Sequence, residues 1–508
     1  MTSGNLSCEV DGIVIYKDIY ENDACINKLL DDYCTPRGID FNALMGSYRV
    51  KIIDNEKDET VFFGDNSGNM CYYYAHGNKS EFLLGVESKR IPDLESIAQF
   101  LVFGCVYSNK TIAKDIYRTN PNMFYISRSG HTIEKSKKLL GFEELEQKTL
   151  ERILESYVKA ASSKKKVAVI TGGVDSRAVL ALLLHMNADV ELCITGSTEH
   201  IDVKIAKQIS EIVGLPLHVF EELPLTADED IISDSFIGSD GVFGVLGRYR
   251  LYNKSLMLKK MGFNVEFGGV AGELYKNSFI NQDFPLYFGK PNLKKFLKYK
   301  IPSSSYPTGF FGEAMQKSIG NAERKVSEEL LLPWLDSKKN KYQVYTDIGY
   351  SILQHRMVTV TNSSARFVLP LSPLMERSLV ASIYNANPYT MECALFQRRQ
   401  ISTFYPIIKK IQTDRGLNCA DDLASISSDI IRNYAFLTNV YINRALNRNT
   451  SKGRLGEAFL VGLYSNEFKK AMKTCKRIGI VQYNADEDRI SPTLADRLMT
   501  VGMFFKDI

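Results

Sequence analysis

The sequence lacks the segments that mark membrane and secreted proteins. No apolar run is long enough to cross a bilayer. The N-terminal stretch Met1–Cys8 has no basic start followed by an apolar segment, which is the pattern of a signal peptide. We therefore expect a protein with no membrane partner and a cytoplasmic location.

An excess of charge of one sign and paired cysteines are also missing. The formal net charge is only +4, from 63 basic and 59 acidic residues, so the composition does not favour a nucleic-acid partner. The nine cysteines are scattered and include no Cys-x-x-Cys pair, which indicates reduced thiols rather than a disulfide framework or a zinc site. With 508 residues and 44% apolar content, the chain is long enough for two or three ordinary globular domains.

Two familiar phosphate-binding motifs are absent from residues 166–184, but a different glycine pattern is present. The stretch has neither the Gly-Lys-Ser/Thr ending of a Walker A loop nor the third glycine of the dinucleotide fingerprint. It begins with the apolar run Val167–Ile170, as in a parallel strand that is buried on both faces. Gly172 and Gly173 follow, and because they lack a Cβ they let the backbone turn and approach a ligand. The apolar run Ala178–Leu184 predicts a helix, whose first turn offers free N–H groups and the positive end of its dipole. This order predicts a cradle for phosphate or pyrophosphate.

Three side chains of this loop suit nucleotide chemistry. Asp175 is placed to hold a magnesium ion through oxygen, and Thr171 and Ser176 are placed to donate hydrogen bonds to phosphate oxygens. The alternative is a generic strand–turn–helix crossover in which the Asp-Ser pair is coincidental.

The first 142 residues read mostly as strands joined by Gly, Asn and Asp turns, which is typical of an antiparallel layered sheet. One helix is predicted there, at Leu94–Phe103, and a second helical stretch, Glu143–Ala161, leads to the next unit. The predicted strands are Val10–Tyr16, Tyr48–Ile53, Thr60–Phe63, Met70–Ala75 and Glu81–Val86.

From Lys164 onward, strands and helices alternate. Further strands are predicted at Asp189–Ile194, Leu217–Phe220 and Asn264–Phe267, with a helix at Asp202–Val213. This alternation indicates a doubly wound α/β sheet, which binds ligands at the carboxyl ends of its strands. From about residue 285 the chain is expected to be mainly helical, with a break at Pro302–Pro307.

The order of these segments resembles that of the asparagine synthetase family, together with the β-lactam synthetases and lasso-peptide cyclases. Thr171–Ser176 (Thr-Gly-Gly-Val-Asp-Ser) is similar to the Ser-Gly-Gly-x-Asp-Ser loop of enzymes that split ATP between its α and β phosphates. Gly268–Glu273 (Gly-Gly-Val-Ala-Gly-Glu) looks like the family's Gly-Asp-Gly-x-Asp-Glu loop. Weaker similarities, persuasive through their order, occur at Leu44–Val50, Phe63–Gly68, Cys71–Tyr74, Thr111–Ile112, Asn120–Pro121, Thr195–Asp202, Ala365–Arg366 and Pro370–Leu371.

The resemblance implies two domains within an α/β chain. Residues 1–142 would form a degenerate glutamine-amidotransferase-like domain, a layered antiparallel fold of the kind built around an N-terminal nucleophile. Residues 143–508 would form an asparagine synthetase-like ATP-pyrophosphatase domain, with a doubly wound sheet and a helical C-terminal extension.

The resemblance also implies an ATP-dependent carbon–nitrogen ligase that uses ATP and Mg²⁺. A substrate carboxylate would attack the α-phosphorus, and an amine would then convert the acyl-adenylate to an amide and AMP. The family's late catalytic lysine or arginine would correspond to Lys410 or Arg415, although a basic pair is also typical of a solvated helix face. Glu273 would be a further catalytic residue and, with Asp175, a metal ligand. The implied nucleotide-binding residues are Ile170, Thr171, Gly172, Gly173, Asp175, Ser176, Thr195, Gly268 and Gly269.

The chain departs from the family at its N-terminus and in the second glycine loop. The family's glutaminases use a cysteine directly after the initiator methionine, whereas Thr2 stands here and Cys8 is internal. We therefore expect a scaffold without glutaminase activity. Gly272 replaces a metal-binding aspartate, so Glu273 is the expected substitute, and Gly269 replaces a side chain near the chemistry. A β-lactam synthetase would have a tyrosine at the place of Gly269, so the glycine argues against that member of the family. The alternative for the whole loop is an ordinary glycine-rich turn.

Four other residues have both a functional and a structural interpretation. His355 and Arg356 would face the acceptor site by resemblance, or form structural pairs. Arg366 fits the family's Ala-Arg motif, or serves as a fold-stabilising ion pair. His218 ends an apolar strand and is expected in the core.

The substrates stay open. Loss of the glutaminase nucleophile favours an amine already present on the substrate, as in lasso-peptide-type macrolactam formation. An ammonia-using enzyme that amidates a sugar acid or small metabolite is the first alternative, and a catalytically silent scaffold or binding protein is the second. A tRNA-thiolating enzyme is disfavoured by the modest charge and the lack of a cysteine pair. A homodimer, or a complex with other biosynthetic proteins, is compatible with each of these.

Overall fold

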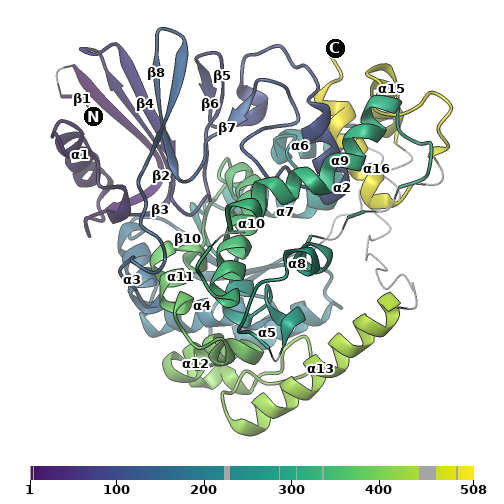
Figure 1. Cartoon of the computed structure of the whole chain (residues 1–508). Helices are drawn as coiled ribbons and strands as arrows, with labels where there is room; N and C mark the ends of the chain where they lie inside the picture. Colours follow the sequence, from purple (N-terminus) through teal and green to yellow (C-terminus); the bar gives the residue numbers. More distant parts are fainter. Residues whose placement is uncertain are drawn as a thin grey trace.

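The computed structural model describes residues 2–3, 5–221, 229–284, 286–301, 303–304, 306–334, 337–445, 465–487 and 490–507. Within them the chain is an α/β protein with antiparallel and parallel sheets (Figure 1). In the predicted break at Pro302–Pro307, Pro302 and Ser305 lie outside the described residues. None of the helices within these ranges is both long and apolar enough to cross a membrane.

The strands and helices have the following bounds. The strands are β1 (Thr2–Ser3), β2 (Leu6–Tyr16), β3 (Leu44–Asp54), β4 (Glu59–Gly64), β5 (Tyr73–Ala75), β6 (Asn78–Ser80), β7 (Tyr117–Arg118), β8 (Met123–Arg128), β9 (His131–Ser136), β10 (Lys166–Val169), β11 (Glu191–Thr195), β12 (Leu217–Phe220), β13 (Val265–Phe267) and β14 (Leu369–Leu371). The α-helices are α1 (Asn22–Tyr33), α2 (Leu94–Phe103), α3 (Leu150–Ala160), α4 (Val174–His185), α5 (Ile201–Val213), α6 (Glu229–Ser239), α7 (Val245–Lys260), α8 (Leu293–Lys300), α9 (Glu313–Leu330), α10 (Lys341–Ser364), α11 (Arg377–Tyr384), α12 (Leu395–Phe404), α13 (Leu423–Ala445), α15 (Asn466–Arg477) and α16 (Pro492–Phe504). The 3-10 helices used below are η2 (Leu83–Gly85), η3 (Gly272–Lys276), η7 (Pro388–Ala394) and η8 (Pro406–Lys410).

The N-terminal sheet is antiparallel, in the order β1-β2-β3-β4-β8-β9. Side chains alternate between its faces, as the twofold period of a strand requires. Val14 and Tyr16 face α1, whereas Ile13 and Ile15 face α3 and the second half of the chain. A small sheet, β6-β5-β7, lies beside it. The sheet therefore has one face on its own helix and the other on the α/β unit.

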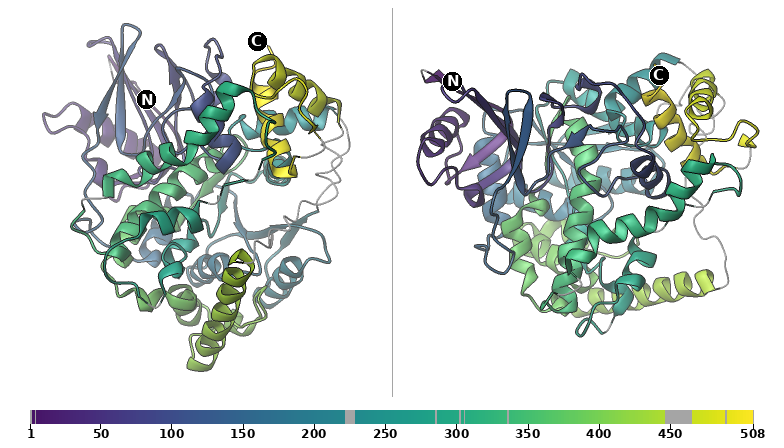
Figure 2. Two further views of the ribbon diagram at one scale, coloured as in Figure 1. Left: turned by 45° about the vertical axis from the view of Figure 1, so that its right-hand side comes forward. Right: turned by 45° about the horizontal axis from the view of Figure 1, so that its top comes forward.

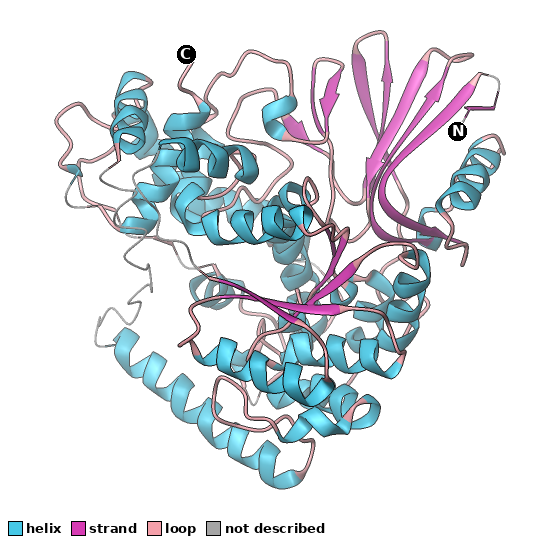
Figure 3. Ribbon diagram, turned by 180° about the vertical axis from the view of Figure 1, so that it is seen from behind, coloured by secondary structure: helices cyan, strands magenta, loops and turns pink. Residues whose placement is uncertain are grey.

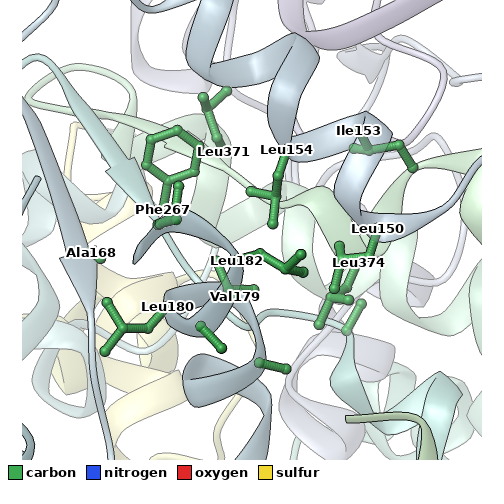
Figure 4. Packing of buried hydrophobic residues seen from close by; sticks show 14 of the residues in the cluster. Leu150, Ile153, Leu154, Ala168, Val179, Leu180, Leu182, Phe267, Leu371 and Leu374 are labelled. Carbon is green, nitrogen blue, oxygen red and sulfur yellow. The ribbon is translucent and has the colours of Figure 1, made fainter. Parts of the chain in front are cut away.

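The second sheet is parallel, in the order β12-β11-β10-β13-β14 (Figure 3). Val167 and Cys193 pack towards Leu258 of α7 on one face, and Ala168 and Ile194 join the core formed with α4 and α5 on the other. Figure 4 shows the dense packing of α3, α4 and the strands in that core. Helices on both faces of a parallel sheet confirm the predicted doubly wound architecture.

Several predicted elements are confirmed with close bounds. The helix at Leu94–Phe103 is α2, which begins after the capping carboxylate of Asp93 and ends at Gly104 in a left-handed conformation (φ 76°). The strand Leu217–Phe220 is β12, and the predicted strands at Val10–Tyr16, Tyr48–Ile53 and Thr60–Phe63 lie within β2, β3 and β4.

The strand predicted at Glu81–Val86 is wrong, because its centre is η2. The backbone N–H groups of Leu83 and Leu84 donate to the carboxylate of Asp240 at 2.6 and 3.0 Å rather than to a neighbouring strand. Asp240 is more than 150 residues away in sequence, so the local sequence pattern could not predict this contact.

Two predicted elements start too early. The strand predicted from Met70 begins at Tyr73, because the N–H groups of residues 70–72 donate to the side chains of Asp65, Asn362 and Thr119. The helix predicted from Glu143 begins at Leu150, where the hydroxyl of Thr149 caps it by accepting from the Arg152 N–H.

The predicted boundary between residues 142 and 143 does not separate the hydrophobic cores. Helix α2 packs against α9 and α16, and its apolar side chains belong to a core that also contains residues of α6, α7 and α15 (Figures 1 and 2). The two-domain division therefore stays a prediction, and the N-terminal segment shares its core with the C-terminal helices.

Candidate functional site

The candidate site lies where the parallel sheet changes its direction of winding. From β10 the chain proceeds outward to β11 and β12, and then returns to place β13 and β14 on the other side of β10. The loops that follow β10 and β13 therefore meet at the carboxyl edge of the sheet. Ligands of doubly wound sheets bind at such a switch point. Both glycine loops singled out in the sequence, residues 171–176 and 268–273, are the loops at this place.

The first glycine loop is held by its own hydroxyls. The Thr171 N–H donates to Ser176 Oγ at 3.1 Å, the two hydroxyls of these residues lie 3.0 Å apart, and the Gly173 N–H donates to Thr171 Oγ1 at 3.2 Å. Ile170 is buried, and its N–H donates to the Cys193 carbonyl. Helix α4 begins at Gly173 without a side-chain cap, so the N–H groups of its first turn are available to a ligand.

One N–H of the loop is bound by a carboxylate from α5. Gly172 donates to Asp202 Oδ1 at 3.0 Å, and a Cβ at position 172 would lie 2.3 Å from that oxygen. The glycine is therefore required by the close approach of Asp202. Asp202 starts the helix that was predicted from the sequence, but its contact with the loop was not predicted.

The second glycine loop packs directly on the first turn of α4. A Cβ at Gly269 would lie 2.6 Å from the Ser176 nitrogen, and a Cβ at Gly272 would lie 2.2 Å from Asp175 Cγ. Any side chain at either position would displace Asp175 or the helix end. This contact explains why glycine stands at both positions. Glu273, the proposed substitute ligand, is exposed, and its role stays a prediction.

Asp175 accepts hydrogen bonds from two side chains that are distant in sequence. Lys276 Nζ lies 2.6 Å from Oδ2, and Gln397 Nε2 lies 2.8 Å from Oδ1. Gln397 is fully buried and also donates to the Gly272 carbonyl at 3.1 Å, so it joins both glycine loops to α12. The Asp175 side chain is 22% exposed.

Residues 411–419 are tied to the first loop by Arg177. This arginine is fully buried in α4, and its guanidinium donates to the carbonyls of Gly172, Ile411 and Gln412. The Asp414 N–H also donates to the Gly172 carbonyl, at 3.2 Å. Residues 411–419, which include the candidate Arg415, therefore lie beside the loop, and the catalytic role expected of this segment stays a prediction.

A pocket of about 290 Å³ opens beside the start of α4. Arg415 lines it together with Gly173 and Lys276, whereas the exposed Lys410 is not among the described residues that line it. Of the two cationic candidates, Arg415 is the one that the fold brings to the pocket. The other lining residues are Val174, Ser278, Asn281, Phe284, Tyr287, Glu392, Cys393, Ala394, Arg398, Thr413, Asp414, Leu417, Asp429 and Ile430.

The pocket is bordered by backbone in the left-handed region. Cys393 (φ 52°) and Ala394 (φ 58°) are consecutive, and Ala271 (φ 72°) and Asn277 (φ 54°) flank η3. Such conformations cost about 1 to 3 kcal/mol each for residues other than glycine, and they cluster at functional sites. The fold therefore maintains strain around this pocket.

A polar cluster lies in the pocket wall away from the loop. Glu392 accepts hydrogen bonds from Asn277 Nδ2, at 2.5 Å, and from the hydroxyl of the buried Tyr287. Burial raises the pKa of the Glu392 carboxyl, and the two donors oppose that shift. Asn277 directly follows Lys276, so one turn of chain contacts two carboxylates, those of Asp175 and Glu392.

Two further nucleotide-binding candidates lie at the same sheet edge. Thr195 ends β11, and its buried Oγ1 has no hydrogen-bond partner in the part of the chain that the structure describes. The Gly268 N–H donates to the Leu371 carbonyl at 3.3 Å, which links the second loop to β14. Orphaned buried polar atoms are uncommon and call for an explanation, such as a bound ligand or water.

Each of the four residues that had both a functional and a structural interpretation contacts another side chain of the chain; they are His355, Arg356, Arg366 and His218. His355 is half-buried with Nδ1 2.6 Å from Arg118, and desolvation together with that cation lowers its pKa well below the usual range. Arg356 donates to the Tyr107 hydroxyl at 2.8 Å. The remaining pairs are Arg366 with Asp240 at 2.8 Å, and His218 with Glu191 at 2.5 Å. The His218 side chain is 24% exposed, so its expected place in the core is wrong.

The two N-terminal candidates, Thr2 and Cys8, lie in the first two strands. Thr2 belongs to the two-residue edge strand β1, where it pairs with Ser7. Cys8 is buried, and burial raises the pKa of its thiol to about 12. A thiol with so high a pKa is almost entirely protonated at neutral pH and is a poor nucleophile.

The residues that sequence reasoning missed are Lys276, Gln397, Asp202, Arg177 and Glu392. Lys276 lies only three residues beyond the second glycine loop, so a longer motif window would have included it. Gln397 and Glu392 lie more than 200 residues after the first loop, and no local pattern distinguishes them.

The chain matches no protein-family model, and no curated protein is significantly similar to it. What the site can hold must therefore be judged from its own residues. Mg²⁺ is usually bound by one or two carboxylates together with substrate phosphates. Asp175 has acceptor capacity beyond its two hydrogen bonds, and the buried Gln397 Oε1 has no partner among the described residues. Over those same ranges, no group of three or more His, Cys, Asp or Glu side chains is arranged to hold a metal ion. Asp175 thus fits as one ligand of an ion that arrives with nucleotide phosphates.

Proposed function

We propose that the protein is an ATP-dependent ligase that adenylates a substrate carboxylate, releases pyrophosphate and joins the activated carbonyl to an amine. One observation carries this proposal. The uncapped first turn of α4, with Asp175 in it, follows the central strand β10 at the switch point and borders a pocket that Lys276 and Arg415 line. Free N–H groups, a helix dipole and two cations at one place are suited to a polyphosphate.

The chemistry follows from the charges at this place. A carboxylate oxygen bonds to the α-phosphorus while the bond to the bridging oxygen of pyrophosphate breaks, so negative charge grows on the leaving group. The N–H groups of α4, with Lys276 and Arg415, would stabilise that charge. Asp175 would hold Mg²⁺ when the ion is bound, and the ion would neutralise phosphate charge. An amine then attacks the acyl-adenylate, AMP leaves, and an amide forms.

The pocket sets the scale of the second substrate. At about 290 Å³ it has room for a small molecule or for one or two side chains, and not for a folded partner. Its wall contains Glu392 and Tyr287, which are hydrogen-bonded to each other. This arrangement is compatible with the end of a peptide, as in lasso-peptide-type macrolactam formation, and with a sugar acid or small metabolite that receives ammonia.

The finer domain assignments belong to the same proposal. We infer an amidotransferase-like scaffold in residues 1–142 that has no glutaminase activity, because Thr2 replaces the nucleophilic cysteine and Cys8 is buried. Residues 143–508 would be the ATP-pyrophosphatase part. A cytoplasmic location, no nucleic-acid or membrane partner, and a homodimer or a complex with other biosynthetic proteins complete the proposal.

Pyrophosphate exchange tests the proposed function without knowledge of the amine. The protein is incubated with ATP, Mg²⁺, labelled pyrophosphate and a panel of carboxylates that includes short peptides, amino acids and uronic acids. Reversible adenylation should return label to ATP with at least one carboxylate. Absence of exchange over the whole panel, together with no ATP binding by calorimetry, would show that the proposal is wrong.

A catalytically silent binding protein is the second candidate. It is favoured by the Asp202 carboxylate, which already accepts from the Gly172 N–H and places a negative charge beside the loop. In that case the protein would bind nucleotide weakly or not at all, and Asp202→Asn would increase nucleotide affinity. An active enzyme in which Asp202→Asn lowers exchange would exclude this candidate.

A further inference from the structure

Lys276 is placed beside the phosphate-binding end of the pocket by a strained turn. It is the last residue of η3, whose flanking residues Ala271 and Asn277 both have positive φ. The side chain lines the pocket with Gly173 and Val174, and its ammonium lies 2.6 Å from Asp175 Oδ2. The lysine side chain is 27% exposed, so the ammonium is in contact with the pocket as well as with the aspartate.

The ammonium of Lys276 keeps hydrogen-bonding capacity beside the start of α4. The N-terminus of α4 carries a partial positive charge of roughly half a unit, which repels a nearby ammonium. Asp175 offsets the charge of Lys276, and the pocket lining contains the carboxylates of Glu392, Asp414 and Asp429 as well as the cations of Lys276, Arg398 and Arg415. An ammonium has three donors, and Asp175 is the one hydrogen-bond partner of Lys276 among the described residues. Two donors of the ammonium therefore remain for a ligand.

The same geometry leaves no room for a side chain at position 272 of the second glycine loop. Gly272 is in contact with Asp175, since a Cβ there would lie 2.2 Å from the carboxylate carbon. The ammonium of Lys276 lies beside that carboxylate.

We propose that Lys276 binds the phosphate oxygens of ATP and of the leaving pyrophosphate, so that a fixed ammonium supplies the charge that a second metal ion would otherwise supply. This inference rests on the proposed function, since it names the group that recognises the diphosphate part of the nucleotide. Asp175 orients the ammonium, and the ammonium turns to the phosphate when the ligand is bound.

The experiment is a calorimetric titration of the full-length chain with inorganic pyrophosphate and with ATP, each in Mg²⁺. The variants are Lys276→Met, Lys276→Gln and Lys276→Arg. A matched control is Lys17→Met, which breaks a pair of similar length, Lys17 Nζ to Asp32 Oδ2 at 2.7 Å, in the N-terminal sheet unit. The methionine and glutamine variants should each bind pyrophosphate at least tenfold more weakly. The arginine variant should stay within about threefold of the wild type, because it retains the charge, and the control should be unchanged.

A magnesium titration separates the ammonium from a metal ion. Wild-type ATP affinity should stop rising once magnesium equals ATP, whereas the Lys276→Gln variant should gain affinity from further free magnesium. Should wild type bind neither pyrophosphate nor ATP, the proposed function itself fails. If wild type binds both and the two neutral variants bind as tightly, ATP use stands and the role of Lys276 is wrong. Thermal unfolding of each variant confirms that it is folded, and Lys276→Gln, which can still donate to Asp175, serves if Lys276→Met does not fold.

Discussion

Two turns of this chain contain a glycine, an aspartate and a hydroxyl residue, and the structure uses them in opposite ways. In the turn after β4, Asp65 is fully buried and accepts from the N–H groups of Ser67, Asn69 and Met70 at 2.6 to 3.0 Å. After β10, in the first turn of α4, Asp175 is partly exposed and accepts from Lys276 and Gln397.

The difference lies in where each carboxylate finds its donors. Asp65 takes backbone donors from its own turn, so its acceptor capacity is consumed in holding local structure. Asp175 takes donors from side chains about 100 and 220 residues away, and keeps capacity for a ligand. Residue type alone does not distinguish a structural turn from a binding turn; the source of the donors does.

Replacing each aspartate in turn should have the largest effects, and it tests directly whether Asp65 and Asp175 have different roles. Asp175→Ala should lower pyrophosphate exchange at least ~100-fold, because the magnesium ion that stabilises the transition-state charge would lose its protein ligand. The same change should alter the free energy of unfolding by less than about 1 kcal/mol, because the side chain is partly exposed. Asp65→Ala should destabilise by about 3 kcal/mol, because three buried N–H groups lose their acceptor. Urea unfolding and the exchange assay measure both. Equal stability losses would show that the two turns have the same role.

Gly272→Ala tests whether the second loop must touch Asp175. The new Cβ would lie 2.2 Å from Asp175 Cγ, so Asp175 or the loop must move. Overpacking of this kind costs about 1 to 3 kcal/mol, and ATP affinity should fall about tenfold as Asp175 leaves its position. Calorimetry and urea unfolding are the measurements.

The matched control for that variant is Gly320→Ala in α9. A Cβ at Gly320 meets nothing within 4 Å, so this change should stabilise the protein by up to about 1 kcal/mol through helix propensity. If both alanine variants behave alike, the contact between Gly272 and Asp175 has no energetic importance.

Glu376 extends the comparison to a carboxylate that joins the two large sheets. It accepts from the Gly46 N–H of β3 at 2.9 Å and from the Tyr157 hydroxyl of α3. Burial raises its pKa to about 7, and both donors oppose that shift. The pKa of Glu376 in the folded protein lies above the value of about 4.3 in an unfolded chain. The protonated carboxyl therefore contributes fully to the free energy of unfolding below about pH 4, and this contribution is lost as the pH rises through 7.

Glu376→Gln removes this titration. The free energy of unfolding of the variant, relative to wild type, should increase by on the order of 1 to 3 kcal/mol between pH 5 and pH 8. Urea unfolding at several pH values measures the difference. A difference that does not change with pH would show that Glu376 has an ordinary pKa in the folded protein.

The smallest effect is expected at the N-terminus. Thr2→Ala should change neither exchange nor amide formation with ammonia or an amine, because we expect no glutaminase chemistry at that residue. Glutamine should also fail to replace ammonia as nitrogen donor in the wild-type protein. Glutamine-dependent activity that disappears in Thr2→Ala would show that the N-terminal unit is an active glutaminase.

Local pattern predicted the elements whose hydrogen bonds are satisfied locally. Helix α2 has a capping aspartate at one end and a left-handed glycine at the other, and strand β12 is a short apolar run with turns around it. The glycine loop after β10 was recognised for the same reason, since strand, turn and helix are contiguous in sequence.

Prediction failed where a distant side chain supplied the hydrogen bonds. Residues 81–86 look like a strand, but Asp240 takes the N–H groups of Leu83 and Leu84. The same reason separates Arg415 from Lys410: both are basic residues in one short segment, and only the fold of η8 and the contact of Asp414 with Gly172 bring Arg415 to the pocket.

The sequence by itself determined the class of fold and the position of the phosphate-binding candidate, because apolar runs, glycines and caps act over a few residues. Only the tertiary structure decided which side chains surround that loop. Lys276, Gln397 and Asp202 reach it from three different elements, and their approach depends on the order of strands in the sheet and on two glycines that allow close contact. Such contacts depend on packing between segments far apart in the chain, which no local pattern encodes.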